Sequence, residues 1–342
     1  MLDDLKYIHQ RDGQDALGVA ERQASQLEFE FETPKIEGQF ENIVFAAMGG
    51  SALPAILSRS WPGYKIPFEV CRQYHIPPYV GPKSLFIACS YSGNTEETLS
   101  ALAEAEEKGA VIAVIAGGGK LEDIAREKNY HFIKVPKAEQ PRYAVFYMLG
   151  AHLAILEAAG LLNESDTSRQ LTEASAFLRE AIKDWVATVP TKQNPAKQMA
   201  MEAAGKSAVV YAGPLLAPVA YKWKINFNEN AKNVAWWGEY PEFNHNEFIG
   251  WSSHPIQKPY FVIDLRSNLE HPRVQKRFEL SDRLLSGKRP AANVVQVQGK
   301  NLLEQTLWAV AFGDFMTIYL GLCNGVNPAP VELVEKFKKE LG

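Results

Sequence analysis

Short apolar segments alternate with segments of helix length over most of this chain. The strand-like runs are NIVFAAM, FEVCR, SLFIACS, AVIAVIAG, HFIKVP, SAVVYAG, PYFVID and ANVVQVQG. This alternation is typical of βαβ units, so the sequence predicts an α/β protein with parallel sheets flanked by helices. At 342 residues the chain is long for one compact core, and we expect two such domains.

The pattern also divides the chain into segments. Residues 1–40 are charged and carry apolar residues at helical spacing (Leu17, Ala20, Ala24 and Leu27), which indicates a helical N-terminal segment. The other expected segments are a first domain (41–162), a helical connector (163–195), a second domain (196–325) and a C-terminal helix (326–342).

A weak internal repeat supports two similar halves. Gly49 and Pro54 in GGSALPA each precede a matching residue, Gly213 and Pro218 in GPLLAPV, by 164 positions. Two matched pairs are little evidence alone, but the order of the expected elements agrees with them.

Charge and cysteine content exclude some classes of protein. With 36 Lys and Arg against 40 Asp and Glu, the net charge is −4, which argues against non-specific nucleic-acid binding. The three cysteines include no CxxC pair, and we expect them to be reduced. The polar start MLDDLKYIHQ does not resemble a signal peptide, and no apolar run approaches the ~20 residues of a membrane span. We therefore expect a soluble, cytoplasmic protein.

The stretch SYSGNTEET, residues 90–98, follows the apolar run SLFIAC and precedes a helix. One hypothesis is ordinary capping, because Asn94 followed by Glu97 fits a capping box and Gly109 fits a left-handed helix end. Capping does not explain why Ser90, Ser92 and Thr95 crowd the same loop. The other hypothesis is an anion site, because hydroxyls and helix N-termini bind phosphate and open α/β sheets bind ligands at this edge.

Two further loops contain glycine. MGGS, residues 48–51, also leaves a strand and enters a helix, and its glycines allow a ligand to approach the backbone closely. GGGK, residues 117–120, is equally well explained as a plain turn. Neither GxGxxG nor GxxxxGK[ST] is present, so the sequence does not favour a dinucleotide or a nucleoside triphosphate.

Six segments in this order carry a resemblance to a known family: MGGSA, SYSGNTEET, GGGKLEDIA, PRYA, LLAPVAYKWKINFNENAK and EYPEFNHNE. Together they resemble the bifunctional phosphoglucose/phosphomannose isomerases, a branch of the sugar isomerase (SIS) superfamily. The resemblance spans nearly the whole chain and implies two SIS-type αβα sandwich domains. It also implies an aldose–ketose isomerase acting on glucose 6-phosphate or mannose 6-phosphate, with no metal or redox cofactor.

The resemblance implies roles for individual residues. Glu229 in NENAK falls on the family's catalytic base, and His245 in NHNE falls on a ring-opening histidine that relatives supply from a neighbouring subunit of a homodimer. Arg142 in PRYA falls on the arginine that stabilises the enediolate, and Lys338 on a lysine at the sugar ring oxygen. The phosphate-binding positions are Gly49, Gly50, Ser51, Ser90, Ser92 and Thr95.

Each assignment competes with a plainer explanation. Glu229 otherwise reads as a surface helix glutamate, His245 as a locally bonded histidine, and Arg142 and Lys338 as charges on solvated helix turns. A zinc site is not predicted, because His245, His254 and His271 lack local ligand spacing and cysteine partners. Trp236, Trp237 and Trp251 flank these motifs and suit core or dimer packing better than sugar stacking.

One segment departs from the family. Relatives commonly have DPTP before the last helix, whereas this chain has Asn327-Pro328-Ala329-Pro330. If the missing threonine hydroxyl recognises the sugar C2 hydroxyl, the preference between glucose and mannose substrates changes here.

Three alternative functions remain at this point. A sugar-phosphate-binding regulator with the same fold carries a DNA-binding helix-turn-helix, for which residues 1–40 are too acidic. A glucosamine-phosphate synthase requires a cysteine after Met1, where this chain has Leu2. A dinucleotide-dependent dehydrogenase lacks its glycine fingerprint.

Overall fold

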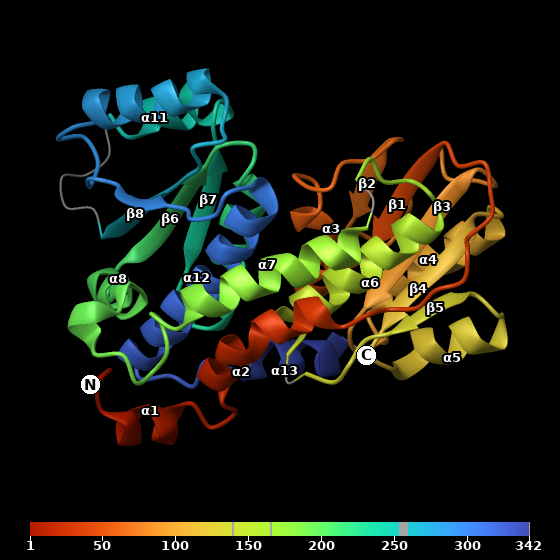
Figure 1. The fold of residues 1–342 in the computed structure, drawn as a ribbon, viewed down its shortest axis with the longest axis horizontal. Helices are drawn as coiled ribbons and strands as arrows, with labels where there is room; N and C mark the ends of the chain where they lie inside the picture. The colour runs from red at the N-terminus through yellow and green to blue at the C-terminus, as the bar shows by residue number, and fades with distance from the viewer. Residues whose placement is uncertain (139, 165, 253–258, 342) are drawn as a thin grey trace. The chain divides into compact units, whose positions relative to one another are not determined.

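The computed structural model describes residues 1–138, 140–164, 166–252 and 259–341 (Figure 1). The chain forms two compact units: unit 2 is Gln23–Ala176, and unit 1 combines Met1–Arg22 with Phe177–Gly342. The division falls inside one helix, α7 (Thr167–Ile182).

Unit 2 contains a five-stranded parallel sheet with the order β2-β1-β3-β4-β5. Its strands are β1 (Asn42–Ala46), β2 (Phe68–Cys71), β3 (Ser84–Ser90), β4 (Val111–Ala116) and β5 (His131–Lys134). Its helices are η1 (Gln23–Glu28), α3 (Gly49–Leu57), α4 (Glu96–Glu107), α5 (Gly119–Glu127), η2 (Pro141–Tyr143) and α6 (Val145–Ala158). All five strand-like runs predicted in this part of the chain form strands.

Helices cover both faces of this sheet. Side chains of α4 and α5, among them Leu102 and Leu121, are buried against Val44, Phe86 and Val114 on one face. Helices α3 and α6 pack against one another and against the strands of the other face. This is the expected αβα sandwich, and it follows from strands whose residues are apolar on both faces.

Unit 1 contains a second parallel sheet with the order β7-β6-β8-β9. Its strands are β6 (Ser207–Ala212), β7 (Ala235–Glu239), β8 (Tyr260–Arg266) and β9 (Asn293–Gln296). Its helices are α1 (Leu5–Arg11), α2 (Ala16–Arg22), η3 (Thr191–Gln193), α8 (Pro195–Ala203), α9 (Ala217–Glu229), η4 (Glu242–His245), α10 (Glu247–Gly250), α11 (Pro272–Leu284), α12 (Leu302–Cys323) and α13 (Glu332–Leu341). Strands β6, β8 and β9 were predicted, whereas AWWGE, which forms β7, was not.

The second sheet is also sandwiched. Val274 and Phe278 of α11, the blue helix labelled in Figure 1, are buried with Val209 and Val262 on one face of this sheet. Helix α9 packs on the opposite side of β6 and β7, and α12 packs on α9 and α8. The two sheets therefore share the order 2-1-3-4 of their strands, which agrees with the weak repeat in the sequence.

Helix α12 corrects one expectation. By length and composition this 22-residue helix is apolar enough to span a membrane, although no apolar run of that size was expected. However, 89% of its most apolar window is buried inside the structure. A buried helix that is apolar all round is typical of the core of a globular domain.

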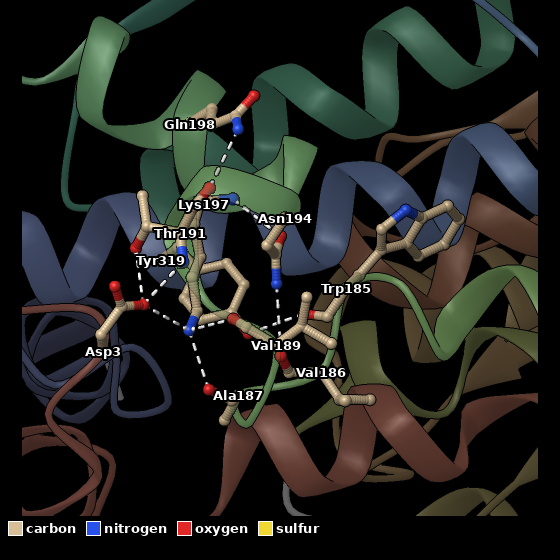
Figure 2. A network of polar contacts seen from close by, with 10 residues as sticks. All are labelled: Asp3, Trp185, Val186, Ala187, Val189, Thr191, Asn194, Lys197, Gln198 and Tyr319. Carbon is tan, nitrogen blue, oxygen red and sulfur yellow. Dashed lines mark hydrogen bonds and ion pairs between the residues drawn. The ribbon is translucent and has the colours of Figure 1, made fainter.

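Within unit 1, a buried lysine ties the start of the chain to the rest of the unit (Figure 2). Lys197 of α8 is fully buried, and its Nζ donates to the carbonyl oxygens of Ala187 and Val189, each at 2.8 Å, and pairs with Asp3 at 3.3 Å. Asp3 also accepts hydrogen bonds from the backbone and hydroxyl of Thr191, which lower the pKa of this carboxyl. The ammonium therefore holds three separate segments together.

Candidate active site

The three hydroxyls of the SYSGNT loop lie together at the carboxyl end of β3. The Ser90 Oγ lies 2.7 Å from the Thr95 Oγ1 and 3.4 Å from the Ser92 Oγ. Ser90 is buried, Thr95 is half-buried and Ser92 is exposed, so the cluster leads from the core to the surface. Such a cluster offers several hydrogen-bond donors to one anion.

The loop after β1 meets this cluster. The backbone N–H of Tyr91 donates to the Ser51 Oγ at 3.0 Å, which joins the MGGS loop to the SYSGNT loop. Strands β1 and β3 are parallel neighbours in the sheet, and the order of strand addition reverses between them, because β2 lies on one side of β1 and β3 to β5 lie on the other. An open sheet of the order 2-1-3-4-5 binds its ligand at this switch point.

Glycines bring a third loop into contact with the hydroxyl loop. A Cβ on Gly93 would lie 1.7 Å from the Gly118 carbonyl oxygen, and a Cβ on Gly119 would lie 2.4 Å from the Ser92 carbonyl oxygen. Both glycines also have positive φ angles, +70° and +72°. The GGGK run is therefore more than a turn, because its backbone packs directly against SYSGNT.

The capping-box hypothesis is wrong. Helix α4 begins at Glu96 with Thr95 as its N-cap residue, and the Thr95 side chain makes no capping hydrogen bond. The Asn94 Oδ1 instead accepts from the backbone N–H of Lys120, at 3.1 Å. The expected left-handed end at Gly109 is confirmed by its φ of +72°.

Among the described residues, no side chain caps α3, α4 or α5. These helices follow β1, β3 and β4, which are adjacent strands. Helix N-termini present unbonded N–H groups and partial positive charge. This edge of the unit 2 sheet therefore combines hydroxyls and N–H groups in an arrangement that suits a phosphate.

Arg142 lies beside the same loops. Its backbone nitrogen is 3.0 Å from the position that a Cβ on Gly50 would take, so PRYA packs against MGGS. The side chain is 2% exposed, and the guanidinium lies 4.6 Å from the centre of the Tyr143 ring. The Tyr143 carbonyl accepts from the Gln26 Nε2 at 2.7 Å, which fixes this segment to η1.

The corresponding switch point of the second sheet, between β6 and β8, holds a carboxylate of the chain itself. The Glu270 Oε1 accepts from the backbone N–H of Leu215 at 2.8 Å, just before α9. A Cβ on Gly213 would lie 2.4 Å from the same oxygen. Burial raises the pKa of Glu270, which is 5% exposed. Glu270 was not predicted from the sequence, because its partner Leu215 lies 55 positions earlier in the chain and no local motif links the two.

Glu229 is the last residue of α9, and it is half-buried. A buried polar cluster fixes this helix against α12. The Lys222 Nζ donates to Asp314, the Asn226 Nδ2 donates to the same carboxylate at 2.6 Å, and the Asn230 Nδ2 donates to the Thr317 Oγ1 at 3.0 Å. These contacts fix the rotation of α9 about its axis and thereby the direction in which the Glu229 side chain points.

His245 and Lys338 occupy exposed positions in unit 1. His245 ends the short helix η4, and Lys338 lies on α13, where its Nζ pairs with Glu335 at 2.9 Å. His254, one of the histidines weighed as a metal ligand, lies outside the described residues. Trp251 is buried in the unit 1 core, whereas Trp236 and Trp237 are 50% and 38% exposed on β7.

Unit 2 thus brings together Ser51, Ser90, Ser92 and Thr95, with Gly49, Gly50 and the Arg142 backbone beside them. Gly49 begins α3 with a φ of +50°. No atom from elsewhere in the described part of the chain lies within 4 Å of the position that a Cβ on Gly49 would take. Glu229, His245 and Lys338 belong to unit 1.

Comparison with known proteins agrees with this fold. Residues 72–162 match the SIS domain family, and residues 192–341 match the bacterial phospho-glucose isomerase C-terminal SIS domain family. A bifunctional phosphoglucose/phosphomannose isomerase of Aquifex aeolicus is 31% identical over 305 residues, which cover 88% of this chain and 91% of the relative. This chain belongs to the bifunctional phosphoglucose/phosphomannose isomerase family.

Two further comparisons show how widely the fold is used. A D-glucosamine-6-phosphate 4-epimerase of Sulfolobus acidocaldarius is 33% identical over 231 residues, or 66% of this chain and 70% of the relative. The crystal structure of a glucose-6-phosphate isomerase like protein from Thermus thermophilus superposes with a TM-score of 0.66 at 18% identity, covering 97% of this chain and 99% of that one. The latter likeness supports the fold alone.

Proposed function

We propose that this protein interconverts glucose 6-phosphate and mannose 6-phosphate with fructose 6-phosphate. The observation that carries the proposal is the hydroxyl cluster at the β1/β3 switch point, in a chain of this isomerase family. In this assignment Ser51, Ser90, Ser92 and Thr95 bind the phosphate, and Gly49 and Gly50 keep the MGGS loop open to it.

The reaction moves one proton between C1 and C2 of the open sugar through an enediol. It needs a carboxylate base, acid–base groups that open the ring, and positive charge near the developing oxyanion. We assign the base to Glu229, stabilisation of the enediolate to Arg142, and ring opening to His245 and Lys338. The oxidation states of C1 and C2 change in opposite directions within one sugar molecule, so this route uses no external redox partner.

We further propose a homodimer in which each chain supplies His245 to its partner's site. The exposure of His245 on η4 agrees with a role outside its own unit. We also propose a cytoplasmic location, which the phosphorylated substrates and the three free cysteines support.

The first test is the formation of fructose 6-phosphate from each aldose phosphate, with EDTA present and no nucleotide added. Turnover of both substrates is expected. Turnover of only one would assign specificity to the segment containing Ala329. Binding without turnover would favour a regulator, and conversion of a hexosamine phosphate to its C4 epimer would assign the epimerase activity instead.

Glu229→Gln tests the base directly. The amide keeps the shape of the side chain and cannot accept the C2 proton, so kcat is expected to fall about 100-fold or more, with substrate binding retained. Steady-state rates and calorimetric binding measure the two effects separately. Wild-type turnover in this variant would remove Glu229 from the role of base.

A further inference from the structure

Lys232 follows α9 in the NENAK segment, and its ammonium joins two distant parts of unit 1. The Nζ donates to the backbone carbonyl oxygens of Glu229 at 2.7 Å, Asn327 at 2.8 Å and Pro328 at 3.0 Å. An ammonium has three N–H donors, so these three carbonyls match its full donor number. The last residue of α9 and the NPAP segment thus lie within 3.0 Å of one nitrogen.

The backbone of Lys232 is also unusual. Its φ angle is +51°, in the left-handed region that normally favours glycine or asparagine after a helix. A lysine at this position pays a conformational cost that glycine would avoid, which indicates that its side chain is needed there.

The NPAP segment, whose carbonyls contact the Lys232 ammonium, is itself held in a fixed conformation. The Asn327 Oδ1 accepts from the backbone N–H of Ala329 at 3.1 Å, and Ala329 is 1% exposed. The turn at residues 327–329 is therefore a closed local structure whose carbonyls point at Lys232.

We propose that Lys232 is a positioning residue, which holds the Glu229 backbone and the 327–329 turn in one fixed arrangement through its three carbonyl contacts. This inference rests on the proposed function, in which Glu229 is the base. A catalytic group displaced by about 1 Å loses roughly 100-fold in rate, so a loosened end of α9 affects the chemical step. Phosphate binding in unit 2 does not depend on this contact.

The experiment compares Lys232→Arg and Lys232→Met with Lys276→Met, an exposed lysine that pairs with Glu279 on α11. Arginine keeps the charge, but its planar fork does not converge three donors on one point. Both Lys232 variants are expected to lower kcat about ten-fold or more, with KM within about two-fold of wild type. Lys276→Met is expected to match wild type.

The outcomes separate the inference from the function on which it rests. Wild-type kcat in Lys232→Arg would overturn the three-carbonyl contact, and a rise in KM without a fall in kcat would overturn positioning of the base. If Lys232→Met does not fold, the kcat and KM of Lys232→Arg alone test the inference. No turnover by the unaltered enzyme would instead refute the proposed function, and wild-type turnover in Glu229→Gln would refute the base alone.

Discussion

Ser92 is the most accessible hydroxyl of the SYSGNT loop, and its bonds within the loop are long, 3.4 Å to the Ser90 Oγ and 3.3 Å from the Asn94 N–H. A phosphate bound as we propose would therefore replace these weak contacts of Ser92 with a charge-assisted hydrogen bond. A hydrogen bond to a charged group contributes about 1.5–3 kcal/mol, so Ser92→Ala is expected to raise KM about ten-fold or more and to change kcat less.

Ser100→Ala on α4 provides the matched control, since it removes a hydroxyl from the same region but outside the loop. Initial rates over a range of glucose 6-phosphate concentrations give both constants. A fall in kcat at unchanged KM would contradict the phosphate-binding role of Ser92.

His152 is a buried residue that the proposed reaction does not use. Its Nε2 lies 3.2 Å from the Tyr64 Oη, and its ring packs edge-on against Phe45 at 4.8 Å. Burial lowers the pKa of His152 to about 3, from an ordinary value of 6.5. The unfolded chain therefore takes up a proton first as the pH falls below about 6.5, and unit 2 loses up to about 1.4 kcal/mol of stability per pH unit from this group.

Urea unfolding at pH 7.0 and 5.5 measures this loss, and His152→Gln is expected to reduce the dependence on pH. His75→Gln serves as the control, because the His75 side chain is 89% exposed. An unchanged pH dependence in His152→Gln would show that another group is responsible.

Single-residue chemistry was predictable from the sequence where it depends on neighbours in the chain. The crowding of Ser90, Ser92 and Thr95 and the left-handed Gly109 are of this kind. The contact of Ser51 with Tyr91 and that of Asn94 with Lys120 join separate loops. No pattern of nearby residues indicates them, so the capping box looked plausible until the fold placed Lys120 beside Asn94.

At the scale of elements, the two sheets share a strand order but differ at the switch point. Hydroxyls lie there in unit 2, and the Glu270 carboxylate lies there in unit 1. Glu270→Ala leaves the Leu215 N–H without this acceptor and is expected to lower the free energy of unfolding by about 1–3 kcal/mol. The KM for sugar phosphate is expected to stay unchanged, because we propose that the phosphate binds in unit 2.

Thermal unfolding and initial rates of Glu270→Ala test both parts. Ser92→Ala is the matched comparison, since it alters the switch point of the other sheet. A ten-fold rise in KM for Glu270→Ala would place the phosphate at the second switch point and contradict our assignment.

Most elements were predictable because apolar runs on both faces mark buried parallel strands. Strand β7 was missed because it lies at the edge of its sheet, where AWWGE exposes Trp236 and Trp237 and shows no buried run. The apolar length of α12 was not predicted, because Glu304 and Asp314 interrupt its run of apolar residues. Asp314 is buried with Lys222 and Asn226 of α9, partners that only the packing of two helices reveals.

At the scale of the whole molecule, catalysis in a homodimer depends on which chain supplies each group. We propose that each site combines Glu229 of one chain with His245 of the partner chain. Glu229→Gln and His245→Ala chains should each be nearly inactive alone. A mixed dimer, however, contains one site with an intact Glu229 and an intact His245.

Mixing the two inactive variants under conditions that exchange subunits is therefore expected to restore activity. Random exchange makes about half of the molecules mixed, and each mixed dimer regains one site, so recovery approaches about a quarter of wild-type activity. Co-expression with two affinity tags isolates the mixed species and gives about half. If purified mixed dimers stay inactive, His245 acts within its own chain, and the exposure of η4 needs another explanation.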